Sequence, residues 1–68
     1  MQEIYKNVRE EVKTVAEFAW SIALALKDSN EAATFLDNVT KYFSNSYTEE
    51  EVEFLRFYFN MQMEMMKE

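Results

Sequence analysis

Residues 48–66 read TEEEVEFLRFYFNMQMEMM, and this segment carries the clearest helix signal in the chain. It opens with the S/T-x-x-E pattern of a capping box, in which Thr48 and Glu51 satisfy each other's backbone N–H groups at the start of a helix. The acids Glu49 and Glu50 complete a first turn that complements the positive end of the helix dipole. The stretch therefore predicts a helix over 48–66.

The apolar side chains of this helix reach around most of its circumference. A surface helix usually has an apolar stripe a little over 100° wide. At about 100° per residue, the apolar side chains of residues 54–66 cover roughly two-thirds of the circle. One side can pack on the rest of the chain. The adjacent side, with Phe54, Phe57 and Met61, then needs either a partner or a central position in a tight three-helix core.

Two further helices are predicted upstream of this stretch. The first covers 3–26, where apolar residues recur at intervals of three and four and so share one stripe. The second covers 29–43 and follows a polar break in which Asp28 or Ser29 can act as the N-cap. The stripe of the first helix is Ile4, Val8, Val12, Val15, Ala19, Ile22 and Leu26, and the apolar face of the second is Ala32, Phe35, Leu36, Val39, Tyr42 and Phe43.

The fold class predicted is all-α, with residues 1–68 forming a single helical domain of three helices. The chain has no glycine or proline, whereas folds built from many short strands rely on such turn residues. Asn45 is the residue best suited to a left-handed cap after the second helix, because asparagine is the usual substitute for glycine there.

The small size of the chain favours self-association. A domain of about 60 residues buries only about 60% of the surface that its unfolded chain exposes. With 68 residues and neither cysteine nor histidine, this chain has no disulfide or zinc site to compensate. Since 49% of its residues are hydrophobic, we expect the helices to assemble as a homodimeric bundle.

The composition also limits the chemistry that the chain can perform. Without histidine or cysteine there is no Ser-His or Cys-His nucleophile pair and no Glu-x-x-His di-metal motif. We therefore expect no enzyme activity, no metal and no cofactor. The sequence has neither a signal-like segment nor the run of about 20 apolar residues that spans a membrane. These features predict a cytoplasmic protein without a membrane partner.

The net charge of −6 makes nucleic acid an unlikely partner. Positions 1–27 hold four acids and four bases, whereas positions 28–68 hold nine acids and three bases. Binding to phosphates requires a basic face. The basic stripe that the chain offers consists of Lys6, Arg9 and Lys13, and it would support a helix-turn-helix-like nucleic-acid-binding regulator as an alternative.

The candidate interface residues lie on two of the predicted helices. In the third helix, the broad apolar surface and its flexible methionines are typical of binding surfaces. In the first helix, Trp20 and Leu24 lie one turn apart and away from the stripe of that helix, unless a neighbouring helix covers this sector as well. The predicted protein interface comprises Phe54, Phe57, Tyr58, Met61, Met65, Trp20 and Leu24.

These observations predict a non-catalytic protein–protein interaction module. We expect a small acidic helical regulator, inhibitor or adaptor that acts as a homodimer through the apolar surface of its third helix. Its partners would be a second copy of itself and another protein of unknown identity. The composition also suits a modulator encoded by a phage or mobile element. The main alternative is a purely structural, self-assembling subunit whose apolar surface is consumed by assembly.

Overall fold

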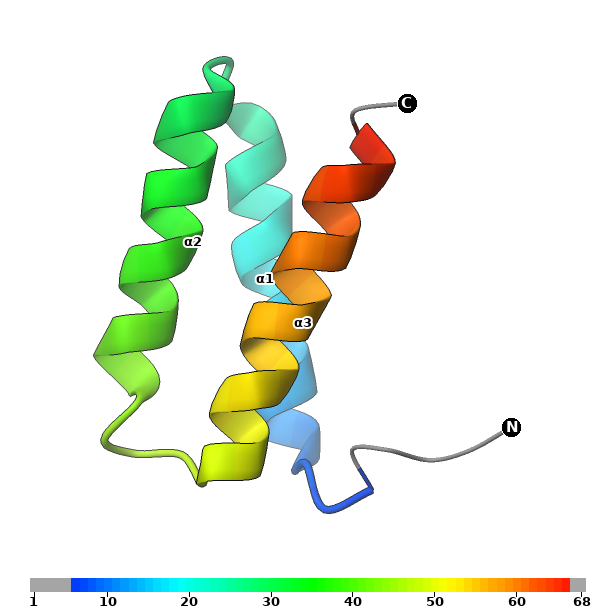
Figure 1. The fold of residues 1–68 in the computed structure, drawn as a ribbon, viewed down its shortest axis with the longest axis vertical. Helices are drawn as coiled ribbons and strands as arrows, with labels where there is room; N and C mark the ends of the chain where they lie inside the picture. Colours follow the sequence, from blue (N-terminus) through cyan, green and yellow to red (C-terminus); the bar gives the residue numbers. More distant parts are fainter. Residues whose placement is uncertain (1–5, 67–68) are drawn as a thin grey trace.

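Three helices pack side by side in the structure. The computed structural model describes residues 6–66, which form α1 (Glu10–Ala25), α2 (Ser29–Phe43) and α3 (Glu49–Met66) and contain no strand. The chain runs up α1, down α2 and up α3, so that α2 is antiparallel to both neighbours (Figure 1). Each helix contacts the other two. The prediction of a three-helix, all-α fold is confirmed.

The starts of α2 and α3 follow their local capping signals. The Asp28 side chain accepts a hydrogen bond from the backbone N–H of Asn30 at 2.8 Å. At α3, the Thr48 hydroxyl accepts from the backbone N–H of Glu51 at 3.2 Å, and Glu51 Oε1 accepts from the backbone N–H of Thr48 at 3.0 Å. This pair of bonds is the predicted capping box.

The start of α1 differs from the prediction. A helix was expected from residue 3, but α1 begins at Glu10, and Arg9 before it is extended with φ −70° and ψ 155°. The reason is a tertiary contact, because the backbone N–H of Arg9 donates to Glu51 Oε2 on α3 at 3.1 Å. Residues 6–9 therefore form a turn and a short extended link outside the helix. The predicted segment 3–5 lies outside the described residues.

The end of α2 needs no left-handed residue. Asn45 was predicted to adopt that conformation, but no residue in the described range 6–66 has a positive φ. Ser44 instead closes the helix, because its backbone N–H and its hydroxyl both donate to the carbonyl of Lys41, at 3.3 and 2.8 Å. The hydroxyl of Ser44 thus satisfies a carbonyl group at the end of α2, without a left-handed cap residue.

Small side chains form much of the core. The buried row of α1 includes Ala16, Ala19 and Ala23, which leaves little side-chain volume between α1 and its neighbours. Close approach of helix backbones is possible because alanine carries no atom beyond Cβ. The buried apolar residues are Val8, Val12, Ala16, Ala19, Ala23, Ala32, Leu36, Leu55 and Phe59.

Several large apolar side chains lie outside this core. Ile22, predicted on the buried stripe of α1, is 41% exposed, and Phe18 next to it is 69% exposed. Tyr42, predicted on the apolar face of α2, is 77% exposed. The physical reason on α1 is that its apolar residues form two overlapping helical rows, and the row that includes the alanines is the one that packs inward.

No helix within residues 6–66 is both long and apolar enough to cross a membrane.

Larger side chains at the buried alanine positions of α1 should destabilise the fold. Replacing Ala16, which is fully buried, with leucine is expected to lower the free energy of unfolding by about 1–3 kcal/mol, because added methylenes force the helices apart. The matched control is Ala25→Leu at an exposed position of the same helix, which should change it by less than about 0.5 kcal/mol. Urea unfolding followed by circular dichroism measures both, and equal effects at the two positions would contradict the close-packed arrangement.

Candidate functional site

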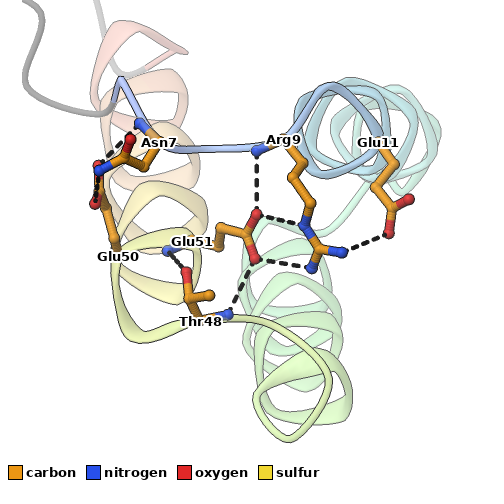
Figure 2. Close-up of polar contacts among 6 residues, drawn as sticks. All are labelled: Asn7, Arg9, Glu11, Thr48, Glu50 and Glu51. Carbon is orange, nitrogen blue, oxygen red and sulfur yellow. Dashed lines mark hydrogen bonds and ion pairs between the residues drawn. The ribbon is translucent and has the colours of Figure 1, made fainter.

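A polar cluster joins the N-terminal segment to the start of α3. The Glu51 side chain is 1% exposed, and its carboxylate accepts bonds from Arg9 Nε at 2.8 Å and Arg9 Nη2 at 3.0 Å. The backbone N–H groups of Arg9 and Thr48 also donate to it. Figure 2 shows these bonds converging on one carboxylate where residues 7–9 cross beside α3. We call Arg9, Thr48 and Glu51 the Arg9–Glu51 clasp.

The opposite charges of Arg9 and Glu51 are paired with each other within the clasp. Hydrogen bonding from the Arg9 guanidinium lowers the pKa of Glu51 from 4.5 to about 2, against the opposing effect of burial. Arg9 also lies 3.6 Å from the Glu11 carboxylate and 5.6 Å from the centre of the Tyr47 ring. Among the described residues, every buried side-chain nitrogen or oxygen has a hydrogen-bond partner. The clasp therefore holds the N-terminal segment against the start of α3.

The clasp changes the interpretation of the predicted basic stripe. Lys6 and Arg9 lie outside α1, so they do not share a helix face with Lys13. Arg9 is turned toward Glu51 and Glu11. The stripe thus loses the residue best suited to a bidentate phosphate contact. The sequence contained no signal for this pairing, because the two residues are 42 positions apart.

An apolar groove lies between α1 and α2, and its exposed lining is apolar. It has a volume of about 260 Å³, and α3 contributes no residue to it. Its exposed large apolar members are Phe18 and Ile22 on α1, while Phe35, Val39 and Phe43 of α2 are partly buried. The lining consists of Thr14, Val15, Phe18, Ala19 and Ile22 from α1 with Phe35, Val39 and Phe43 from α2. We call this surface the α1–α2 groove.

The groove was not predicted from the sequence. The signal that could have revealed it is the spacing of Val15, Phe18 and Ile22, which repeats at three and four residues and so forms a helical row of its own. The spacing of Phe35, Val39 and Phe43 does the same on α2. Each row was instead assigned to the interior, in whole or in part.

Acidic side chains lie on the groove side of both helices. Glu11 precedes Val15 by four residues and Glu31 precedes Phe35 by four, so each carboxylate lies one helical turn before a groove residue and on the same side. Both acids are exposed. The nearby charges of Arg9, Glu51 and Glu11 sum to −1, so Arg9 does not reverse the sign at that end.

The lysines of α1 and α2 lie on the opposite sides of their helices. Lys13 stands two residues from Val15, and Lys41 two residues from Val39, which places each lysine roughly 160° around its helix from the groove. Lys41 is also paired with Asp37 at 3.2 Å. The rim of the groove therefore has a negative character.

The interface predicted on α3 and α1 lies elsewhere, and none of its seven residues lines the groove. Trp20, Phe54 and Tyr58 are partly buried and pack against the core. The remaining four are more exposed, with fractions of 55% for Leu24, 49% for Phe57, 42% for Met61 and 63% for Met65. Met61 and Met65 are one turn apart on α3, and we call these two residues with Leu24 the methionine surface.

Other hollows on the described surface are more polar than the groove. A pocket of about 180 Å³ between α2 and α3 contains Asp37, Arg56 and Asn60, but the Thr40 hydroxyl beside them is already bonded to the Leu36 carbonyl. Within residues 6–66, no group of three or more potential ligand side chains could hold a metal ion. The groove and the methionine surface are therefore the principal candidates for function.

Searches against protein-family models, curated proteins and solved structures find no match to this chain. Its function is therefore inferred from its own geometry.

The clasp should give the protein a distinct acid sensitivity. In the unfolded chain Glu51 takes up a proton near pH 4.5, whereas the folded carboxylate resists protonation until about pH 2. Protonation in this window favours the unfolded state, so the stabilisation by Glu51 is present above pH 4.5 and lost as the pH falls. Glu51→Gln should lower the free energy of unfolding by about 1–2 kcal/mol at pH 6, and this difference from wild type should shrink toward pH 2.5.

Urea unfolding at a series of pH values measures this difference. The control is Glu53→Gln, which removes the same charge at an exposed position of α3 and should show no such trend. A difference between wild type and Glu51→Gln that stays constant from pH 6 to pH 2.5 would show that Glu51 is not held ionised by the clasp.

Proposed function

We propose that this protein is a non-catalytic protein-interaction module that binds a helical segment of another protein in the α1–α2 groove. The observation that carries the proposal is the exposure of large apolar side chains on α1, whose alanines are buried instead. Phe18 is 69% exposed at the groove, although it could have filled the interior. Apolar surface concentrated in a concave site is typical of binding surfaces.

The shape of the groove supports a helix as its occupant. Two antiparallel helices line it, and each presents apolar residues over about two turns, which corresponds to a length of roughly 11 Å. A fourth helix placed between two such rows would complete a four-helix bundle. Docking of an amphipathic helix into an apolar groove is a common mode of peptide recognition.

The methionine surface supports the second element of the proposal, a homodimer. Leu24, Met61 and Met65 lie outside the groove, so self-association there would leave the groove open to another protein. Met side chains adapt readily to a second surface. The small core of alanines and valines gives an added reason, since a 68-residue chain gains stability by burying further apolar area between copies. In this arrangement the protein acts as a regulator, inhibitor or adaptor.

Partner capture tests the interaction function. We expect the wild-type protein, used as bait in extracts of cells that produce it, to retain a defined protein that Phe18→Glu no longer retains. A carboxylate in the groove removes apolar contact and adds a desolvation cost. Asn60→Glu is the matched control, because it places the same charge at an exposed position of α3, outside both the groove and the methionine surface. Identical proteins retained by all three baits would refute binding in the groove.

Sedimentation at micromolar concentration tests the homodimer. We expect the wild type to sediment at twice the chain mass of 8.2 kDa, and Met65→Glu to shift it toward the monomer, because a charge buried between copies lacks a partner. Phe18→Glu should remain dimeric. A wild-type protein that sediments as a monomer would refute the homodimer and would leave the groove proposal to the capture experiment.

A further inference from the structure

We infer that the occupant of the α1–α2 groove is an amphipathic helix of another protein that carries lysine or arginine beside its apolar stripe. This inference rests on the proposed function and adds the chemistry of the partner. It follows from the juxtaposition of an apolar floor, exposed carboxylates on the groove side of both helices, and lysines turned away from it.

The two acids are placed to contact a helix lying in the groove. Glu11 lies one turn before Val15, near the start of α1, and Glu31 lies one turn before Phe35, near the start of α2. Because α1 and α2 are antiparallel, these carboxylates mark opposite ends of the groove, on opposite walls (Figure 1). Neither the apolar lining nor Thr14 supplies a positive charge.

A helix with basic flanks would find a carboxylate of opposite charge at each end of the groove. Its apolar stripe would cover Phe18 and Ile22, and its flanking cations would approach Glu11 and Glu31. Complementary charges at the rim of an interface contribute mainly to the rate of association and to the rejection of wrong partners. An acidic helix would bring like charges together at both ends, and the net charge of −6 on this chain would oppose its approach.

The same charges argue against a second copy of this chain as the occupant. Two copies joined groove to groove would gather Glu11 and Glu31 from each at one interface, whereas Lys13 and Lys41 lie on the far sides of their helices. Like charges from the two copies would then face each other, with only Arg9, which lies 3.6 Å from Glu11 of its own chain, to offset them. A homodimer through the methionine surface avoids this conflict, because that surface uses the other flank of α1.

Two designed peptides test the partner chemistry directly. Both are about 18 residues long, helical and labelled with a fluorophore, with the same leucines at intervals of three and four; one has lysine and arginine flanks, and the other has glutamate flanks. Fluorescence anisotropy with the full-length protein should show that the basic peptide binds at least about tenfold more tightly. Raising the salt concentration from about 50 to 300 mM should weaken binding of the basic peptide, since exposed charges are screened.

Three variants locate the binding. Phe18→Glu should abolish binding of the basic peptide, and Asn60→Glu, which adds the same charge at an exposed position of α3 outside the groove and the methionine surface, should leave it unchanged. The double variant Glu11→Gln/Glu31→Gln keeps the apolar lining of the groove. It should lower the affinity for the basic peptide about three- to tenfold and raise the affinity for the acidic peptide. Circular dichroism confirms that each variant is folded, and the double variant supplies the same test should Phe18→Glu not fold.

The outcomes separate this inference from the proposed function. Equal binding of both peptides, lost in Phe18→Glu, would support the groove as a docking site and overturn the basic partner. Tighter binding of the acidic peptide, or binding of neither, would also overturn the basic partner, and partner capture would then decide the proposed function separately. Conversion of a wild-type dimer to a monomer by Phe18→Glu would show that a second copy occupies the groove, which overturns the inference.

Discussion

The buried face of α1 consists largely of alanine, and this sets how the three helices pack. Ala16, Ala19 and Ala23 face the neighbouring helices, so α1 approaches them with little side-chain volume between. The interior that results is too thin to hold the larger apolar residues of the same helix. Phe18 and Leu24 consequently lie on the two outer flanks of α1, at 69% and 55% exposure. The surfaces proposed for binding are thus a direct result of how the core is packed.

The Arg9–Glu51 clasp sets the position of α3 against the start of α1. A buried carboxylate is costly unless its hydrogen-bonding capacity is filled. Here Arg9 supplies two side-chain donors and its backbone N–H, and the N–H of Thr48 supplies a further donor. Glu51 therefore serves two purposes, as the acid of the local capping box and as the anchor of a tertiary contact. Because the backbone N–H of Arg9 bonds to Glu51, α1 begins only at Glu10.

Charge distribution gives the two apolar surfaces different characters. The α1–α2 groove has Glu11 and Glu31 on its side of the helices, whereas Lys41 is held by Asp37 on the far side of α2. The methionine surface has flexible thioether side chains that can adapt to a copy of themselves. A protein with both could assemble through one surface and recognise a partner through the other. This division is the basis of the interaction function that we propose.

The number of helices, the bounds of α2 and the capped start of α3 were predictable from the amino-acid sequence. These features depend on residues within four positions of one another, such as Asp28 with Asn30 and Thr48 with Glu51, so local patterns are sufficient to predict them. The apolar spacing of α1 was less decisive, since Val12 and Ala19 belong both to a row with Val15 and Ile22 and to a row with alanines. Periodicity alone does not choose between two overlapping rows.

Three features depend instead on contacts between helices: the start of α1, the choice of its buried row, and the position of the groove. The start of α1 depends on Arg9 and Glu51, which are 42 positions apart in the chain. Burial of the alanine row depends on how closely the other helices approach, and this is a property of all three helices together. The groove exists because Phe18 on α1 and Phe35 on α2 face the same side of a pair of helices, and no single helix contains that relation.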